Sequence, residues 1–116
     1  MRTLHCDYFT PKSLMTPDGQ YWGVVGITNH SAEKQVCALT VLDYDSGKEI
    51  NRIGITLQPM QSMLLTNQHE PFLDMLGRTR LYLDCSPFVT ATVGNTKGKT
   101  SALSWERMVE LPFPKA

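Results

Sequence analysis

Short runs of apolar residues, separated by turn residues, follow one another along most of the chain. Residues 21–27 are dominated by β-branched and aromatic side chains, and this run ends at Asn29. Gly23 and Gly26 lie inside it, and a glycine in a helix interior costs about 1 kcal/mol relative to alanine. The run therefore predicts a strand.

Residues 35–44 alternate with the two-residue period of a strand. One face carries Cys37, Leu39 and Val41. The other face is also rather apolar, and it consists of Val36, Ala38, Thr40, Leu42 and Tyr44. Two apolar faces predict a strand in the middle of its sheet, or a strand whose outer face is covered by a partner chain.

Residues 45–48 form a turn signal, since Asp45 favours turn initiation and Gly47 tolerates positive φ. The following residues, 49–57, alternate again. They predict a returning strand with Ile53, Ile55 and Leu57 inward and Arg52, Gly54 and Thr56 outward.

Further strands are expected at residues 62–66, 79–84, 88–93 and 100–111, with a helix over residues 106–109 as the alternative within the last run. Residues 94–99 are expected to form a long exposed turn. In the third of these runs, Val89, Ala91 and Val93 share one face. One short helix is predicted near residues 70–76, because Asn67 or His69 can cap its start and Gly77 can end it.

Short strands with turn signals about every ten residues are typical of a sandwich or barrel. A length of 116 residues suits one domain with its own core. The sequence therefore predicts a single domain over residues 1–116, an all-β, immunoglobulin-like antiparallel sandwich of about seven or eight strands with the one short helix.

Composition and charge narrow the functional classes. Eleven Lys and Arg balance eleven Asp and Glu, and a neutral chain argues against nucleic acid as a partner. No apolar run is long enough to span a bilayer, and no signal peptide is visible, so we expect no membrane insertion and a cytoplasmic location. Cys6, Cys37 and Cys85 are expected to be free thiols, since their spacing forms no C-x-x-C pair.

Catalytic and metal-binding signatures are missing from the sequence. It contains no G-x-S-x-G elbow, H-E-x-x-H helix or phosphate-binding glycine loop. His5, Cys6 and Asp7 offer three ligand types, but adjacent strand residues point to opposite faces and cannot all reach one ion. We therefore predict a protein that is not an enzyme, with no catalytic residues, metal or cofactor; an enzyme built on His69, Glu70 and Asp74 is the remote alternative.

Aromatic and basic residues are the candidates for binding. Tyr21, Trp22 and Trp105 are large, and exposed aromatics on strands mark interfaces more often than catalytic sites. Arg78 and Arg80 form a basic patch with Lys97, Lys99 and Arg107 if the turn after Val93 lies near the strand that starts at Thr79. Scattered solubilising charges are the default interpretation of these residues.

Three motifs follow one another along the chain. Residues 26–31 contain a strand that ends in Asn29, residues 41–45 lead into an Asp/Tyr hairpin, and residues 55–59 form a Thr-Leu-x-Pro corner. This order resembles the sensory rhodopsin transducer family of small cytoplasmic β-sandwich proteins that assemble as oligomers. The similarity covers residues 20–66 and part of 85–93, including Ser86-Pro87-Phe88-Val89. Residues 92–99 depart from the charged segment of that family, so no functional residue is carried over.

Two functional hypotheses follow. The first is a non-enzymatic interaction or ligand-binding module that forms a homo-oligomer and serves as a signalling transducer or assembly protein for an unidentified partner, as the resemblance also implies. The alternative is a small carbohydrate-binding sandwich that uses Trp22 or Trp105 as a stacking platform.

Overall fold

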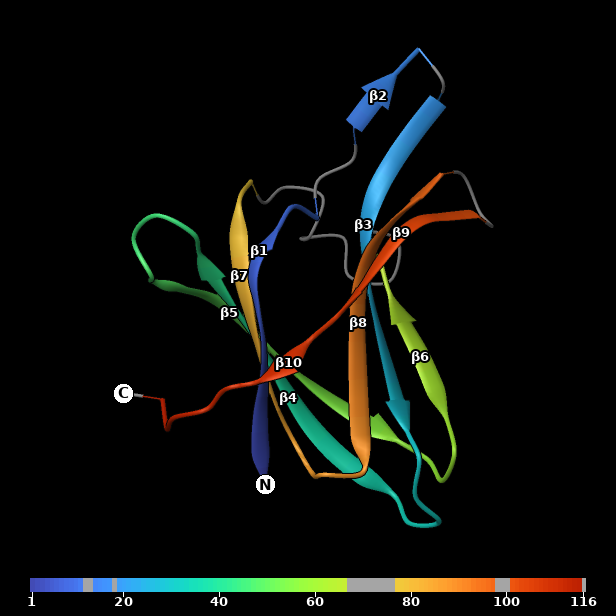
Figure 1. Cartoon of the computed structure of the whole chain (residues 1–116), viewed down its shortest axis with the longest axis vertical. Helices are drawn as coiled ribbons and strands as arrows, with labels where there is room; N and C mark the ends of the chain where they lie inside the picture. Colours follow the sequence, from blue (N-terminus) through green and yellow to red (C-terminus); the bar gives the residue numbers. More distant parts are fainter. Residues whose placement is uncertain (12–13, 18, 67–76, 98–100, 116) are drawn as a thin grey trace.

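The computed structural model describes residues 1–11, 14–17, 19–66, 77–97 and 101–115. These residues form ten strands, arranged in two antiparallel sheets that pack face to face (Figure 1). The predicted antiparallel sandwich is confirmed, with more strands than the seven or eight expected. The helix predicted near residues 70–76 lies outside the described residues.

The first sheet has the strand order β10-β1-β7-β4-β5. Its strands are β10 (Val109–Glu110), β1 (Arg2–Phe9), β7 (Thr79–Cys85), β4 (Gln35–Asp43) and β5 (Glu49–Leu57). β4 pairs with β7 on one edge and with β5 on the other, so the prediction that it lies inside its sheet is confirmed.

The second sheet has the path β2-β3-β8-β9, and β6 also pairs with β3. Its strands are β2 (Leu14–Thr16), β3 (Gly19–Asn29), β6 (Ser62–Leu65), β8 (Val89–Lys97) and β9 (Ser101–Arg107). The long strand β3 is paired along one edge by β8, and β2 and β6 share its other edge. β9 is therefore an edge strand of this sheet.

Two expectations for the last third of the chain are wrong. Residues 94–97 continue β8 instead of forming an exposed turn, because they pair with both β3 and β9. The run expected as one last strand is divided into β9 and β10, which belong to different sheets. The chain crosses between the sheets at Met108, which is 3% exposed and donates its backbone N–H to the Ala91 carbonyl at 3.0 Å.

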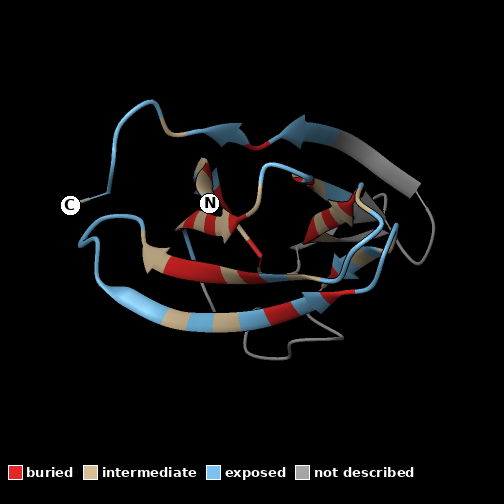
Figure 2. Ribbon diagram, turned by 90° about the horizontal axis from the view of Figure 1, so that it is seen from below, coloured by how far each residue is buried: buried red, intermediate tan, exposed pale blue. Residues whose placement is uncertain are grey.

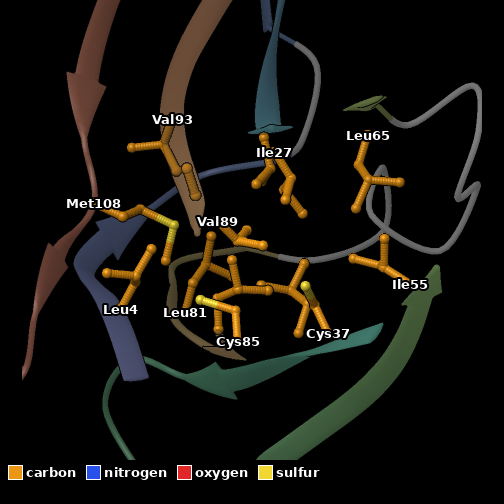
Figure 3. Close-up of a cluster of buried hydrophobic side chains, with 14 of the residues drawn as sticks. Leu4, Ile27, Cys37, Ile55, Leu65, Leu81, Cys85, Val89, Val93 and Met108 are labelled. Carbon is orange, nitrogen blue, oxygen red and sulfur yellow. The ribbon is translucent and has the colours of Figure 1, made fainter. Parts of the chain in front are cut away.

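The core lies between the inner faces of the two sheets (Figure 3). Buried and exposed residues alternate along the strands, as Figure 2 shows by colour. The residues predicted to point inward, Ile53, Ile55 and Leu57, are buried or partly buried. Of the faces that the sequence grouped without choosing an inward side, the core takes those of Cys37, Leu39 and Val41 and of Val89, Ala91 and Val93. Burial of this apolar surface, at about 25 cal/mol per Å², is the main force that holds the sheets together.

Asn29 is fully buried at the end of β3 and ties two loops together. Its Nδ2 donates to the Glu33 carbonyl at 2.8 Å and to the Gln58 carbonyl at 3.0 Å. Its Oδ1 accepts from the backbone N–H of Ser31 at 2.9 Å and from the Ser31 hydroxyl at 2.8 Å. Asn29 and the corner after β5, which carry part of the family resemblance, therefore form one hydrogen-bonded structural unit.

Candidate functional site

Both tryptophans lie on the outer face of the second sheet. The register places Val24 opposite Gly94, and Gly94 opposite Trp105. Directly opposed residues share a face, as do residues two apart on one strand, so Trp22 joins them. The other face of these strands carries the core residues Val25 and Val93. We call this outer surface the tryptophan face; its members are Trp22, Val24, Gly26, Thr28, Ser62, Leu64, Thr90, Thr92, Gly94, Trp105 and Arg107.

The indole of Trp105 lies against the sheet over a glycine. Gly26 pairs with Leu64 on one side and with Thr92 on the other. A Cβ added at Gly26 would lie 3.0 Å from Thr92 Oγ1, 3.4 Å from Leu64 Cδ2 and 3.8 Å from Trp105 Cζ3. The indole therefore reaches across β8 as far as β3, where the absence of a side chain leaves room for it. Trp105 is still 44% exposed, so part of the ring remains available to a ligand.

Hydroxyl groups occupy the same face beyond the indole. Thr28 lies opposite both Ser62 and Thr90, and its Oγ1 is 2.8 Å from the Ser62 Oγ. His30 Nε2 lies 2.8 Å from the Thr90 Oγ1 at the end of this row. A hydroxyl both donates and accepts hydrogen bonds, so the row offers both functions to a polar ligand beside the apolar indole.

The predicted arginines lie on the other side of the sandwich. Arg78 Nη2 is 2.9 Å from Asp45 Oδ2, and the guanidinium lies 5.6 Å from the centroid of the Tyr44 ring. Arg80 pairs with Leu42 on the outer face of the first sheet. Arg107, by contrast, lies opposite Thr92 on the tryptophan face. The structure therefore does not bring these three arginines together.

The other residues of the predicted basic patch and of the aromatic set are only partly described. Lys99 lies outside the described residues, and the description does not extend to the side chains of Lys97 and Tyr21. Of the predicted aromatics, the structure therefore places Trp22 and Trp105 on the same face of the second sheet.

A cleft that the sequence did not reveal opens between the sheets beside β9. It has a volume of about 460 Å³, and its lining includes Tyr8, Thr10, Asn95, Trp105 and Glu106. Asn95 fell within the predicted turn, and the other residues come from distant strands, so no local pattern marks this cleft. Trp105 thus borders both the cleft and the tryptophan face.

The thiols are poorly suited to nucleophilic chemistry. Burial raises the pKa of Cys37 to about 11, with a smaller contribution from Cys85 nearby. Burial also raises the pKa of the Cys6 thiol, and the carboxylates of Glu106 and Asp7 add to the effect. A thiol with a raised pKa carries little reactive thiolate near neutral pH.

Metal ligands do not gather in the described part of the chain: no three His, Cys, Asp or Glu side chains there could hold one ion. His5 and Asp7 share a face, with Nδ1 and Oδ1 2.7 Å apart, while Cys6 packs against the core. No helix within the described residues is long and apolar enough to cross a membrane.

Comparison with known proteins identifies a fold but no family. No family model matches the chain, and no curated protein matches it. The crystal structure of Thermotoga maritima 1070 is similar, with a TM-score of 0.68 over 95% of this chain and 92% of that chain, at 14% identity. At this identity the likeness shows the β-sandwich fold alone. The resemblance to the sensory rhodopsin transducer family is not confirmed and stays a prediction.

Proposed function

We propose that this chain is a non-enzymatic binding module whose tryptophan face takes a polyhydroxylated ligand, such as a segment of a sugar chain. The observation that carries the proposal is the half-exposed indole of Trp105, which lies on the outer face of the second sheet beside a row of hydroxyl groups. Sugar rings present C–H faces that pack on aromatic rings, and hydroxyls at their rims. Such a ligand would match both parts of this surface.

The sparse apolar content of the face also favours a polar ligand. Among the described residues of β3, β6, β8 and β9, the exposed large apolar side chains are those of Leu64 and Trp105. A stable protein interface buries about 800 Å² on each partner and has an apolar centre. Two exposed apolar side chains and the partly exposed Trp22 offer a small centre for such an interface but suffice for one or two sugar rings.

Titration of a panel of soluble oligosaccharides, followed by calorimetry on any hit, tests the proposal. We expect Trp105→Ala to weaken binding by about tenfold or more, because the stacking surface is removed. Tyr44→Ala is the matched control, since Tyr44 is a similarly exposed aromatic (39%) in the turn after β4, away from the tryptophan face. Lack of binding across the panel, or equal losses in the two variants, would exclude sugar recognition by the tryptophan face.

Self-association through the same face is the second candidate. Its support is the edge strand β9, whose outer edge presents backbone groups for pairing with another chain, next to exposed Leu64 and Trp105. This arrangement suits a homo-oligomer in signalling or assembly. Light scattering over a hundredfold range of concentration tests it: a dimer or larger species that Trp105→Arg dissociates supports it, and a constant monomer excludes it.

A further inference from the structure

The outer face of the first sheet carries a second cavity, separate from the tryptophan face. Residues 111–115 cross this sheet after β10, and the backbone N–H of Leu111 donates to the Thr3 carbonyl at 2.9 Å. Lys115 Nζ lies 2.9 Å from Asp84 Oδ2 and 5.5 Å from the centroid of the Tyr82 ring. A cavity of about 470 Å³ lies beside this segment; its lining includes Thr40, Leu42, Arg52, Tyr82, Phe113 and Lys115.

Apolar and aromatic side chains form one part of this cavity. Leu42 and Tyr82 come from the sheet, and Leu111 and Phe113 come from the crossing segment. Phe113 is 62% exposed, so its ring lies at the rim. The cavity can therefore receive a flat or aliphatic group between the sheet and this segment.

A cation and an unpaired hydroxyl form the polar part. Tyr82, Thr40 and Arg52 are consecutive partners across β7, β4 and β5, so their side chains share the outer face. Thr40 is 7% exposed, and its Oγ1 has no hydrogen-bond partner among the described residues. Most buried hydroxyls have a hydrogen-bond partner. Because Thr40 lines this cavity, rotation of its side chain would bring the unpaired hydroxyl to a ligand there.

Among the described residues, Arg52 makes one long ion pair on this face, with a carboxylate that is already shared. Its Nη2 lies 4.0 Å from Asp84 Oδ2, while Asp84 already accepts from the Thr3 hydroxyl at 2.6 Å and from Lys115 at 2.9 Å. The Arg52 side chain is 59% exposed, and its planar group can donate two parallel hydrogen bonds to a carboxylate. Glu49 also lines the cavity and would repel a ligand with a second negative charge.

We propose that this cavity binds a small amphipathic monocarboxylate. The carboxylate accepts hydrogen bonds from Arg52 and from the hydroxyl of Thr40, and the apolar part lies between Tyr82 and Phe113. This site is independent of the function proposed for the tryptophan face, since the two lie on the outer faces of different sheets.

A matched pair of probes tests the proposal. Binding of 3-phenylpropionate and of the uncharged 3-phenylpropan-1-ol to the whole chain is measured by NMR titration, with benzoate and hexanoate as further acids. We expect 3-phenylpropionate to saturate and to bind at least about tenfold more tightly than the alcohol, with shifts in residues of β4, β5 and β7. Failure of all three acids to saturate, or equal affinity for acid and alcohol, would overturn the proposal.

Two exposed arginines provide the matched variants. Arg52→Gln is expected to reduce the affinity for 3-phenylpropionate to that of the alcohol. Arg107→Gln makes the same change of charge on the tryptophan face and is expected to leave the affinity unchanged. Equal losses in the two variants would mean that net charge alone attracts the acid, and the cavity would then be excluded as its site.

Discussion

The outer faces of the two sheets differ in what lies over them. On the first sheet, residues 111–115 pass over β7 and β4, and Thr40 in the middle of β4 is only 7% exposed. On the second sheet Val24 is also buried, but Trp105 is 44% exposed although its indole contacts the sheet. The apolar outer face of β4, which suggested a partner chain, is thus partly covered by a remote segment of the same chain. An apolar outer face is therefore weak evidence for an oligomer until the path of the whole chain is known.

Asp84 helps to hold residues 111–115 on the first sheet, together with the backbone hydrogen bond from Leu111 to Thr3. It accepts hydrogen bonds from Thr3 of β1 and Lys115 of the crossing segment. The tryptophan face has hydroxyl pairs instead, such as Thr28 with Ser62. On the first sheet a charged contact therefore stabilises the outer face, whereas neutral hydrogen bonds between side chains do so on the second. This difference can be tested.

The largest expected difference between the two faces is in the loss of stability when a glycine is replaced by valine. Gly26→Val is expected to destabilise the fold by about 1–3 kcal/mol, because even its Cβ would lie 3.0 Å from Thr92 Oγ1. Gly54→Val is the control on the first sheet, where a Cβ would meet nothing within 4 Å, and it is expected to be neutral or slightly stabilising. Urea unfolding measures both; similar losses would show that the indole and Thr92 do not close tightly over Gly26.

Two buried threonines differ in whether the hydroxyl has a hydrogen-bond partner, and their valine variants compare the two cases. Thr79→Val is expected to cost about 1–3 kcal/mol, because the Thr79 hydroxyl donates to the Phe9 carbonyl at 2.7 Å and that acceptor would lose its partner. Thr40→Val removes a hydroxyl without a described partner and is expected to leave stability unchanged or higher. A comparable loss for Thr40→Val would show that its hydroxyl is paired in solution and would weaken the case for a ligand there.

Acid pH is expected to loosen the cover on the first sheet. Burial raises the pKa of Asp84, but hydrogen bonds from Lys115 and Thr3 outweigh burial and hold that pKa below its usual value. This stability is present above the unfolded-state pKa of about 4 and is lost as the pH falls below it. Between pH 6 and pH 3, the free energy of unfolding is expected to depend less on pH in Asp84→Asn than in the parent chain. Identical pH profiles of this free energy would contradict a stabilising role of the ionised Asp84.

The smallest expected effect is at the exposed end of the first sheet. Arg78→Gln removes the ion pair with Asp45, in which the two side chains are 56% and 66% exposed, and is expected to cost less than about 0.5 kcal/mol. Lys115→Gln, whose partner Asp84 is only 17% exposed, is expected to cost more, up to about 1 kcal/mol. Chemical denaturation measures the loss of stability in each variant. A larger loss in Arg78→Gln than in Lys115→Gln would show that the contact between Lys115 and Asp84 does not hold residues 111–115 in place.

Local alternation was enough to predict much of the first sheet. The inward residues of β5 and the interior position of β4 follow from period-two patterns that are read within one strand. The same reasoning joined β9 and β10 into one strand, because nothing in the local pattern signals that Met108 enters the core between two sheets.

The candidate sites depend on contacts between distant residues. Trp22 and Trp105 share a face because β8 pairs with β3 on one edge and with β9 on the other. Either tryptophan could be identified as a binding candidate from sequence, but not their common face or the glycine beneath the indole. The cavity beside residues 111–115 was missed for the same reason, since β4, β5 and β7 meet that segment only in the fold.

The sequence by itself determined an antiparallel β architecture and the inward side of its clearest strands, because side chains alternate along a strand whatever its neighbours are. Only the tertiary structure decided which strands are neighbours, and hence which side chains share a surface. Strand pairing joins residues as far apart as Thr92 and Gly26, and it depends on the packing of the whole core. For the same reason, the tertiary structure alone decided that one outer face is covered by the chain itself while Trp105 remains open on the other.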